Sequence, residues 1–305
     1  MMQYEELIKQ INKVILKANI KINEPMENYT SFKVGGPADI LVTPENAEEV
    51  QSIIKICKEN KVDYYLIGNG SNLLVRDGGI RGVVIKLSNL NKIEVEGNMI
   101  IAQSGATLYD VTMIALDKGL KGIEFASGIP GSMGGAAAMN AGAYDGEMSM
   151  VLESILAIDN NGELLTLTNE EMELTYRSSA VLINGYTVIS VTLKLSEGDK
   201  ETIKARMDVL AKRRSDKQPL EYPSAGSTFK RPEGHYASVL IQDCDLKGIS
   251  VGDAEVSVKH SGFIINKKNA SAKNILDLIK LVQKKVKEKY GVQLDTEVKI
   301  WGEDK

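Results

Sequence analysis

The chain has 305 residues, and its 37 Lys and Arg against 41 Asp and Glu give a formal net charge of −4. With 26% charged and 43% hydrophobic residues, it has the composition of a folded protein, which argues against a disordered chain or one that coats nucleic acid. One hydrophobic core rarely spans this length, so we expect two or three subdomains.

The chain contains no run of about 18 or more apolar residues, which excludes a transmembrane helix and predicts no membrane insertion. Near the N-terminus, Glu5, Glu6 and Lys9 alternate with apolar residues. This pattern predicts an amphipathic helix over residues 3–18 and lacks the uncharged core of a secretion signal. We therefore expect a cytoplasmic protein.

Cysteine and histidine are too rare to build a metal cluster or a disulfide framework. Cys57 and Cys244 lie far apart and form no C-x-x-C, and the histidines are His235 and His260. Neither a structural zinc site nor a disulfide is expected.

The following segment predicts alternating helices and strands. After an extended stretch over 32–42, a helix is expected over 45–60 and a buried strand at Tyr64–Ile67. Farther along, the same signals predict strands at 83–85, 100–102, 154–159, 163–168 and 186–195, and helices at 107–118, 198–215 and 271–290. The overall class is α+β.

The C-terminal part begins with the charged helix over 198–215, and the Pro-rich stretch that follows cannot be helical. The helix over 271–290 has Ser271 as its expected N-cap and ends at Gly291. A last strand-like segment runs from Val292 to Trp301. We expect a domain boundary near residue 200.

Two glycine-rich stretches, residues 68–72 and 128–135, follow β-like runs. No G-x-G-x-x-G follows a strand, and no G-x-x-x-x-G-K-[ST] occurs, so a classical dinucleotide or P-loop site is not expected. Several main-chain N–H groups converging from a tight turn hold a pyrophosphate well, and a Cβ would obstruct that approach. The alternative is that these glycines only form turns.

A series of motifs, covering about residues 20 to 302, resembles the UDP-N-acetylenolpyruvoylglucosamine reductase (MurB) family, in its shorter type without the tyrosine loop. The matching segments, in chain order, are 28–38, 68–72, 128–135, 176–179, 223–230, 260–266 and 297–300. Any one of these motifs is weak, whereas their common order is specific.

The resemblance implies a two-subdomain FAD-binding fold of the vanillyl-alcohol-oxidase (PCMH) type plus a C-terminal α+β substrate-binding domain. The corresponding ranges are 1–85 and 86–200 for the FAD-binding subdomains and 201–305 for the substrate domain, whose last strand returns to the active site. The residues expected to contact FAD are Ile67, Gly68, Asn69, Gly70, Ser71, Asn72, Leu73, Gly128, Ile129, Pro130, Gly131, Ser132, Gly134, Gly135, Asn140, Ala141 and Gly142. Neither histidine lies in these stretches, so the flavin is expected to be non-covalent.

The reaction implied by the resemblance is the NADPH-dependent reduction of UDP-N-acetylglucosamine enolpyruvate to UDP-N-acetylmuramate. Arg177 is the expected cation for the substrate carboxylate, Ser227 the proton donor, and Glu297, as the protonated acid, a group that polarises that carboxylate. Lys217 and Lys230 flank the Ser227 loop and are candidate ligands of the substrate diphosphate or carboxylate. Outside the motifs, each would be read as a surface or turn residue.

Two alternatives remain beside this prediction. One is a related flavoprotein that passes electrons to oxygen, which would share the glycine stretches but would not need Arg177, Ser227 and Glu297 in these motifs. The other is a catalytically silent protein that binds a nucleotide sugar or FAD. The presence of all three candidate catalytic residues argues against both.

Overall fold

The computed structural model describes residues 4–305, which form two compact units. Unit 1 comprises the residues up to 22 together with 40–69 and 82–213, and unit 2 comprises 23–39, 70–81 and 214–305. Both units mix helices and strands, which confirms the predicted α+β class. The predicted roles of residues 1–85 and 86–200 in binding FAD, and of residues 201–305 in binding the substrate, stay predictions.

The α-helices are α1 (Glu5–Ile11), α2 (Ala47–Glu59), α3 (Leu108–Asp117), α4 (Met133–Ala138), α5 (Ala180–Asn184), α6 (Lys200–Lys217), α7 (Ala237–Asp243) and α8 (Ala272–Tyr290). The 3₁₀ turns are η2 (Lys17–Asn19), η3 (Met26–Tyr29), η4 (Leu87–Asn89), η5 (Glu124–Ala126) and η6 (Met148–Met150).

The first strands are β1 (Ile20–Pro25), β2 (Pro37–Val42), β3 (Tyr64–Ile67), β4 (Leu73–Val75), β5 (Ile80–Lys86), β6 (Ile93–Glu96), β7 (Met99–Gln103), β8 (Leu120–Lys121), β9 (Gly142–Ala143) and β10 (Gly146–Glu147). The later strands are β11 (Leu152–Ile158), β12 (Leu164–Thr168), β13 (Thr187–Lys194), β14 (Ser196–Glu197), β15 (Ser250–Val251), β16 (Ala254–Val256), β17 (Ile264–Asn266) and β18 (Lys299–Trp301).

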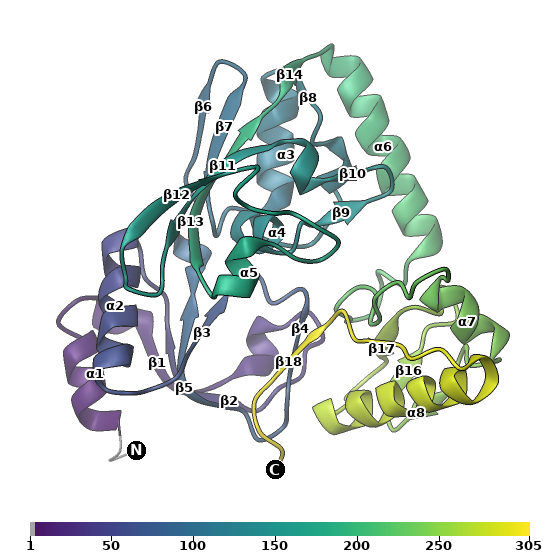
Figure 1. Ribbon diagram of the computed structural model, residues 1–305. Coiled ribbons are helices and arrows are strands. Elements are labelled where there is room, and N and C mark those ends of the chain that lie inside the picture. Colours follow the sequence, from purple (N-terminus) through teal and green to yellow (C-terminus); the bar gives the residue numbers. More distant parts are fainter. Residues whose placement is uncertain (1–3) are drawn as a thin grey trace. The chain divides into compact units, whose positions relative to one another are not determined.

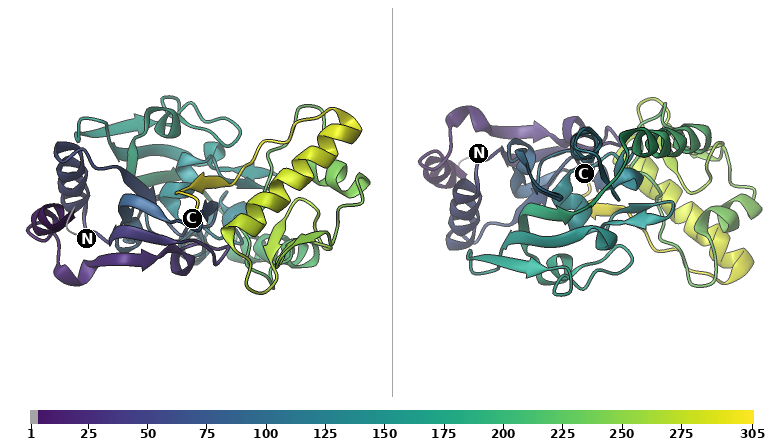
Figure 2. Two further views of the ribbon diagram at one scale, coloured as in Figure 1. Left: turned by 90° about the horizontal axis from the view of Figure 1, so that it is seen from below. Right: turned by 90° about the horizontal axis from the view of Figure 1, so that it is seen from above.

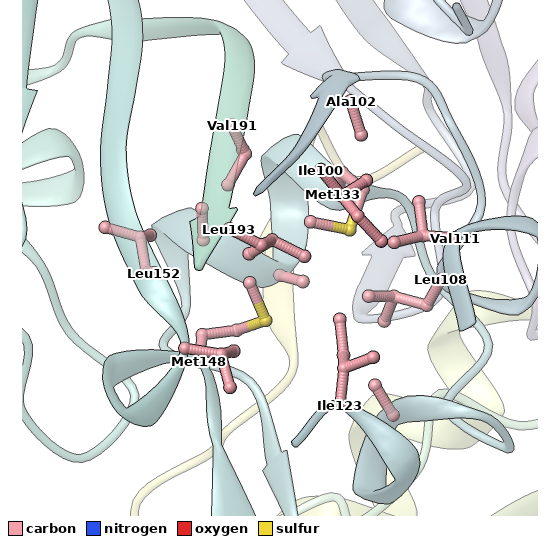
Figure 3. Packing of buried hydrophobic residues seen from close by; sticks show 14 of the residues in the cluster. Ile100, Ala102, Leu108, Val111, Ile123, Met133, Met148, Leu152, Val191 and Leu193 are labelled. Carbon is pink, nitrogen blue, oxygen red and sulfur yellow. The ribbon is translucent and has the colours of Figure 1, made fainter. Parts of the chain in front are cut away.

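Unit 1 contains an antiparallel five-stranded sheet with the order β12-β11-β13-β7-β6 (Figure 1). Helices α3 and α4 pack on it, and the residues between them form a dry core that includes Ile100, Met133 and Leu193 (Figure 3). The second glycine stretch enters this core through Met133, so the loop that precedes α4 is fixed by hydrophobic packing.

A four-stranded sheet has the order β1-β2-β5-β3, and β3 pairs with β5 in parallel. Helices α1 and α2 contact one another beside it (Figures 1 and 2). Ile53, Ile54 and Cys57 of α2 lie in a core that also receives Ile158 and Ile189 of the five-stranded sheet. This shared core joins the two layers of unit 1.

Unit 2 packs α8 against α7 and against the antiparallel sheet β15-β16-β17. Its core contains one face of α8, including Ile275, Leu278 and Val282, together with Phe32 and Leu74 from earlier in the chain. Strands β4 and β18 pair in parallel, so the C-terminal strand lies beside the residues that follow the first glycine stretch.

Two predicted elements are wrong in extent. The helix expected over 3–18 ends at Ile11 within the described residues, because the main chain changes to i→i−3 hydrogen bonds such as Val14 N to Ile11 O at 3.0 Å. Ile15 lies beyond the end of the helix, and the turn places its side chain in the core. The expected strand Val292–Trp301 is limited to β18, since the preceding residues pair with a different segment of the chain.

The residues 4–305 contain no helix with both the length and the apolar character of a membrane span. Over the same residues, no cluster of three or more His, Cys, Asp or Glu side chains is placed to hold a metal ion. Both Cys57 and Cys244 are free thiols, and burial raises the pKa of Cys57 to about 12.

Candidate active site

The first glycine stretch follows strand β3, as predicted. A Cβ placed on Gly68 would lie 2.1 Å from Oγ of Ser132, so the two glycine stretches touch at this point within unit 1. In unit 2, Gly70 has a φ of +60°, and a Cβ there would lie 2.0 Å from the carbonyl oxygen of Tyr29. Both glycines are therefore required by close contacts within the protein itself.

The second stretch follows the 3₁₀ turn η5 and not a strand, which corrects the sequence prediction. It turns sharply because its main-chain N–H groups bind back to earlier residues: Met133 N donates to Ala106 O at 2.8 Å and Gly134 N to Ser104 O at 2.9 Å. A Cβ on Gly134 would lie 2.5 Å from the Ser104 Cβ. This glycine lets α4 approach the end of strand β7.

The first turn of α4 is open at one residue. Ser132 is its N-cap but makes no side-chain capping hydrogen bond. Gly135, in the first turn, is exposed, and a Cβ there would meet nothing closer than Ser132 Oγ at 3.5 Å. The N–H groups of Met133 and Gly134 are bound to Ala106 O and Ser104 O, so the open position for the pyrophosphate of a dinucleotide is the exposed turn at Gly135, where no Cβ obstructs the approach. The residues present thus fit an FAD.

The third predicted cofactor segment, residues 140–142, opens the hairpin of β9 and β10. Gly142 is required by this hairpin, since a Cβ there would lie 2.7 Å from the Glu147 Cβ. Asn140 is buried, and its carbonyl and that of Gly142 face Arg177, whose Nη1 and Nη2 donate to them at 3.3 and 3.4 Å. The structure therefore joins Arg177 to this segment.

Arg177 lies in a tight turn closed by two hydrogen bonds between Thr175 and Ser178. Its φ of +57° is in the left-handed region, which costs energy for a side chain other than glycine. Its guanidinium lies 5.1 Å from the ring centre of Tyr176.

In unit 2, Ser227 lies between two buried apolar residues, Ala225 and Phe229. The adjacent Thr228 is fixed on both sides, because its N–H donates to Gly262 O at 2.8 Å and its carbonyl accepts from Glu297 N at 2.8 Å. Ser227 and Glu297, predicted from separate motifs, are therefore brought together within one unit. Arg177 belongs to unit 1.

Of the two candidate lysines, Lys230 belongs to the same ladder, and its N–H donates to Asp295 O at 2.9 Å. Lys217, the last residue of α6, is exposed.

Burial lowers the pKa of His260, and the positive charges of Lys247 and Lys217 lower it further. Its Nδ1 accepts from Gly262 N at 3.2 Å, so the side chain of His260 binds the main chain of its own turn.

The hydrogen bonds that hold these residues in place were not predicted from the sequence. Asn72, predicted as an FAD contact, also donates its Nδ2 to Glu297 O at 3.1 Å, and its own carbonyl accepts from Lys299 N at 3.0 Å. Glu147, which binds the side chain of Asn140, was not predicted at all. No local pattern marks such contacts, since each partner is distant along the chain.

Two family models match separate parts of this chain. The family model described as FAD binding domain matches residues 38–168, and that described as UDP-N-acetylenolpyruvoylglucosamine reductase, C-terminal domain, matches residues 218–301. Phl p 4.0202, a glucose dehydrogenase, shares the fold alone, with a TM-score of 0.51 and 15% identity over 70% of this chain and 50% of its own. The family model and the shared fold thus define a protein with an FAD-binding domain of the PCMH type.

Full-length relatives are closer. The UDP-N-acetylenolpyruvoylglucosamine reductase of Clostridium novyi (strain NT) is 59% identical over 304 residues, covering 100% of this chain and 99% of that protein. The crystal structure of the reductase from Thermus caldophilus has a TM-score of 0.80 and 36% identity, covering 93% of this chain and 98% of its own. The chain belongs to the UDP-N-acetylenolpyruvoylglucosamine reductase family and is an FAD-containing oxidoreductase.

Proposed function

We propose that this chain reduces UDP-N-acetylglucosamine enolpyruvate to UDP-N-acetylmuramate in peptidoglycan precursor synthesis, with electrons from NADPH. The names of its full-length relatives support this activity. The observation that carries the proposal is the hydrogen bond from Glu297 N to Thr228 O. It holds the predicted proton donor, Ser227, and the predicted carboxylate-polarising residue, Glu297, in one rigid ladder.

When bound, FAD would accept a hydride from NADPH and deliver it to the alkene of the substrate. The residues proposed to hold it are those at 67–73, at 128–132, 134 and 135, and at 140–142. In this proposal the open turn at Ser132 and Gly135 receives the pyrophosphate. The binding is non-covalent, because His235 and His260 lie outside all three segments.

The protein must stabilise the charge that hydride addition creates. When the hydride forms a C–H bond at one alkene carbon, the electron pair of the double bond moves toward the substrate carboxylate. Arg177 is proposed to face that carboxylate, since a guanidinium meets it through two parallel hydrogen bonds and stays charged. Arg177 donates to two neutral carbonyl groups, those of Asn140 and Gly142, which help to orient the guanidinium.

The second carbon needs a proton, which Ser227 is proposed to donate, while Glu297 as a neutral acid donates a hydrogen bond to the substrate carboxylate. A free serine is a weak acid, so the transfer depends on the fixed position that Thr228 gives it. Lys217 and Lys230 are proposed to bind the diphosphate or carboxylate. We further propose that the enzyme acts in the cytoplasm, where NADPH and nucleotide sugars are found.

The test is an anaerobic titration of the purified protein, followed by its visible spectrum. NADPH should bleach the flavin absorbance, and UDP-N-acetylglucosamine enolpyruvate should restore it, with one NADP and one UDP-N-acetylmuramate formed for each cycle. A protein that binds no FAD would contradict the proposal. So would a reduced flavin that oxygen reoxidises rapidly and the enolpyruvyl compound does not.

A further inference from the structure

The side chain of Asn140 connects three separate parts of unit 1. Its Oδ1 accepts from Ser149 N at 2.9 Å, and its Nδ2 donates to Glu147 Oε1 at 3.1 Å and to Thr175 O at 3.2 Å. The residue is only 1% exposed. Both donors of its carboxamide thus have protein partners, so the side chain is already used inside the unit.

The main chain of Asn140 also contacts the turn that carries Arg177. Its carbonyl accepts from Arg177 Nη1 at 3.3 Å, beside the second contact from Arg177 Nη2 to Gly142 O. Asn140 therefore holds the Arg177 turn at two places: at its start through Thr175 O, and at the guanidinium through its own carbonyl. A φ of +42° at Asn140 aims that carbonyl, and asparagine tolerates this conformation better than most residues.

From these contacts we propose that Asn140 is a positioning residue for Arg177 in the step that uses the enolpyruvyl substrate. This inference rests on the proposed function, in which Arg177 meets the substrate carboxylate. A guanidinium must be aligned to bind a carboxylate through two hydrogen bonds, and small displacements of a reacting group cost large factors in rate. Asn140 contributes to that alignment through neutral groups, its carboxamide and its main-chain carbonyl.

The carboxylate of Glu147 is part of the same arrangement. It accepts hydrogen bonds from Asn140 Nδ2 at 3.1 Å and from Ser149 Oγ at 2.5 Å. These neutral donors satisfy a negative charge that lies on the segment next to Arg177. Replacing the carboxamide of Asn140 with a carboxylate would place a second negative charge against Glu147 and remove the donors to Glu147 and Thr175.

Two variants separate the roles of side chain and backbone. Asn140→Asp keeps the shape of the residue and its tolerance of positive φ, but it loses both donors. Asn140→Gly keeps the backbone conformation and removes the side chain entirely. The control is Asn169→Asp, because Asn169 likewise donates its carboxamide to two acceptors, the main-chain carbonyls of Ser149 and Leu152, and shares Ser149 with Asn140 but not Thr175.

The measurement is anaerobic rapid mixing of each FAD-loaded variant, first with NADPH and then, after reduction, with UDP-N-acetylglucosamine enolpyruvate. For both Asn140 variants, oxidation of the flavin by substrate should slow by about 10- to 100-fold relative to the wild type, and by much more than reduction by NADPH does. Asn169→Asp should lower thermal stability and leave both half-reactions unchanged. In an Arg177→Lys background, Asn140→Gly should have a much smaller effect, because its target is already altered.

Several results would overturn the inference. Equal slowing of both half-reactions in the FAD-loaded variants would limit Asn140 to holding the cofactor, and failure of both variants to fold while Asn169→Asp folds would limit it to the fold. If Arg177→Lys slows oxidation by substrate and the Asn140 variants do not, Asn140 has no positioning role although the proposed function stands. If Arg177→Lys itself has no effect, the proposed role of Arg177 fails instead.

Discussion

The main-chain N–H of Glu297 donates to the carbonyl of Thr228 at 2.8 Å. Next to it, Lys230 N donates to Asp295 O at 2.9 Å, and Phe229 and Thr296 form an antiparallel bridge. The carbonyl of Glu297 is in turn held by Asn72 Nδ2. The two predicted catalytic residues of unit 2, one of which adjoins Thr228, therefore share a main-chain ladder tied to the first glycine stretch.

The first prediction concerns Ser227. Removing its hydroxyl in Ser227→Ala should slow oxidation of the reduced flavin by the enolpyruvyl substrate by at least about 100-fold, the usual contribution of a positioned proton donor. Reduction of the flavin by NADPH should be nearly unchanged, because that step needs no proton on a substrate carbon. Single-turnover absorbance measurements on each half-reaction check both expectations.

The matched control for Ser227 is Ser224→Ala in the same loop, which should leave both half-reactions near the wild-type rate. Equal losses in the two half-reactions of Ser227→Ala would remove Ser227 from the role of proton donor.

The second prediction concerns the protonation state in which Glu297 acts. If the neutral acid donates a hydrogen bond to the substrate carboxylate, the amide of Glu297→Gln can donate in its place. That variant should retain most of the rate of flavin oxidation by substrate, whereas Glu297→Ala should lose about 100-fold or more, as for other electrostatic contacts to a transition state. Steady-state rates and substrate affinity of the two variants provide the test, and equal rates in both would refute this role.

Local sequence signals predicted those elements whose causes lie close together in the chain. Strand β3 has the expected bounds, Tyr64–Ile67. Helix α8 begins after Ser271, whose Oγ accepts from Asn274 N, and ends at Gly291 with a φ of +71°. A capping side chain and a left-handed glycine are encoded within a few residues of the helix end, so they can be read without the fold.

Features that depend on distant partners could not be predicted in this way. The apolar alternation before Trp301 indicated one long strand, yet the chain pairs first with residues 228–230 and then with β4. In the same way, the family resemblance marked Asn140 as an FAD contact and gave no sign that its carboxamide binds Glu147 and Thr175. The candidate catalytic residues were found through family motifs, because no local pattern marks their chemistry.

The third prediction concerns stability. The carboxylate of Asp77 accepts from the N–H groups of Ala272 at 2.9 Å and Lys273 at 2.8 Å, at the start of α8. Because these groups have no partner within the helix, Asp77→Ala should lower the free energy of unfolding by about 1 kcal/mol. Chemical denaturation followed by circular dichroism gives this value.

The control for Asp77 is Asp277→Ala, which removes a carboxylate that pairs with the side chain of Lys273 on the surface of α8. An exposed ion pair contributes little, so this variant should unfold close to the wild-type midpoint. Losses of the same size in the two variants would show that Asp77 acts as a surface charge and not as a helix cap.

The last prediction concerns pH and His260. Burial, followed by the charges of Lys247 and Lys217, holds the pKa of His260 below its ordinary value of 6.5. The unfolded chain therefore takes up a proton near pH 6.5 while the folded chain resists it, so this contribution to stability is complete above pH 6.5 and is lost as the pH falls toward the folded pKa. Denaturation curves between pH 7.5 and 5.5 should show a larger loss of stability for the wild type than for His260→Asn, whose side-chain oxygen can still accept from Gly262 N.

Lys217→Met should reduce this loss of stability without abolishing it, because burial is the larger cause of the lowered pKa. Identical pH dependence in the wild type and His260→Asn would show that this histidine titrates alike in the folded and unfolded chains.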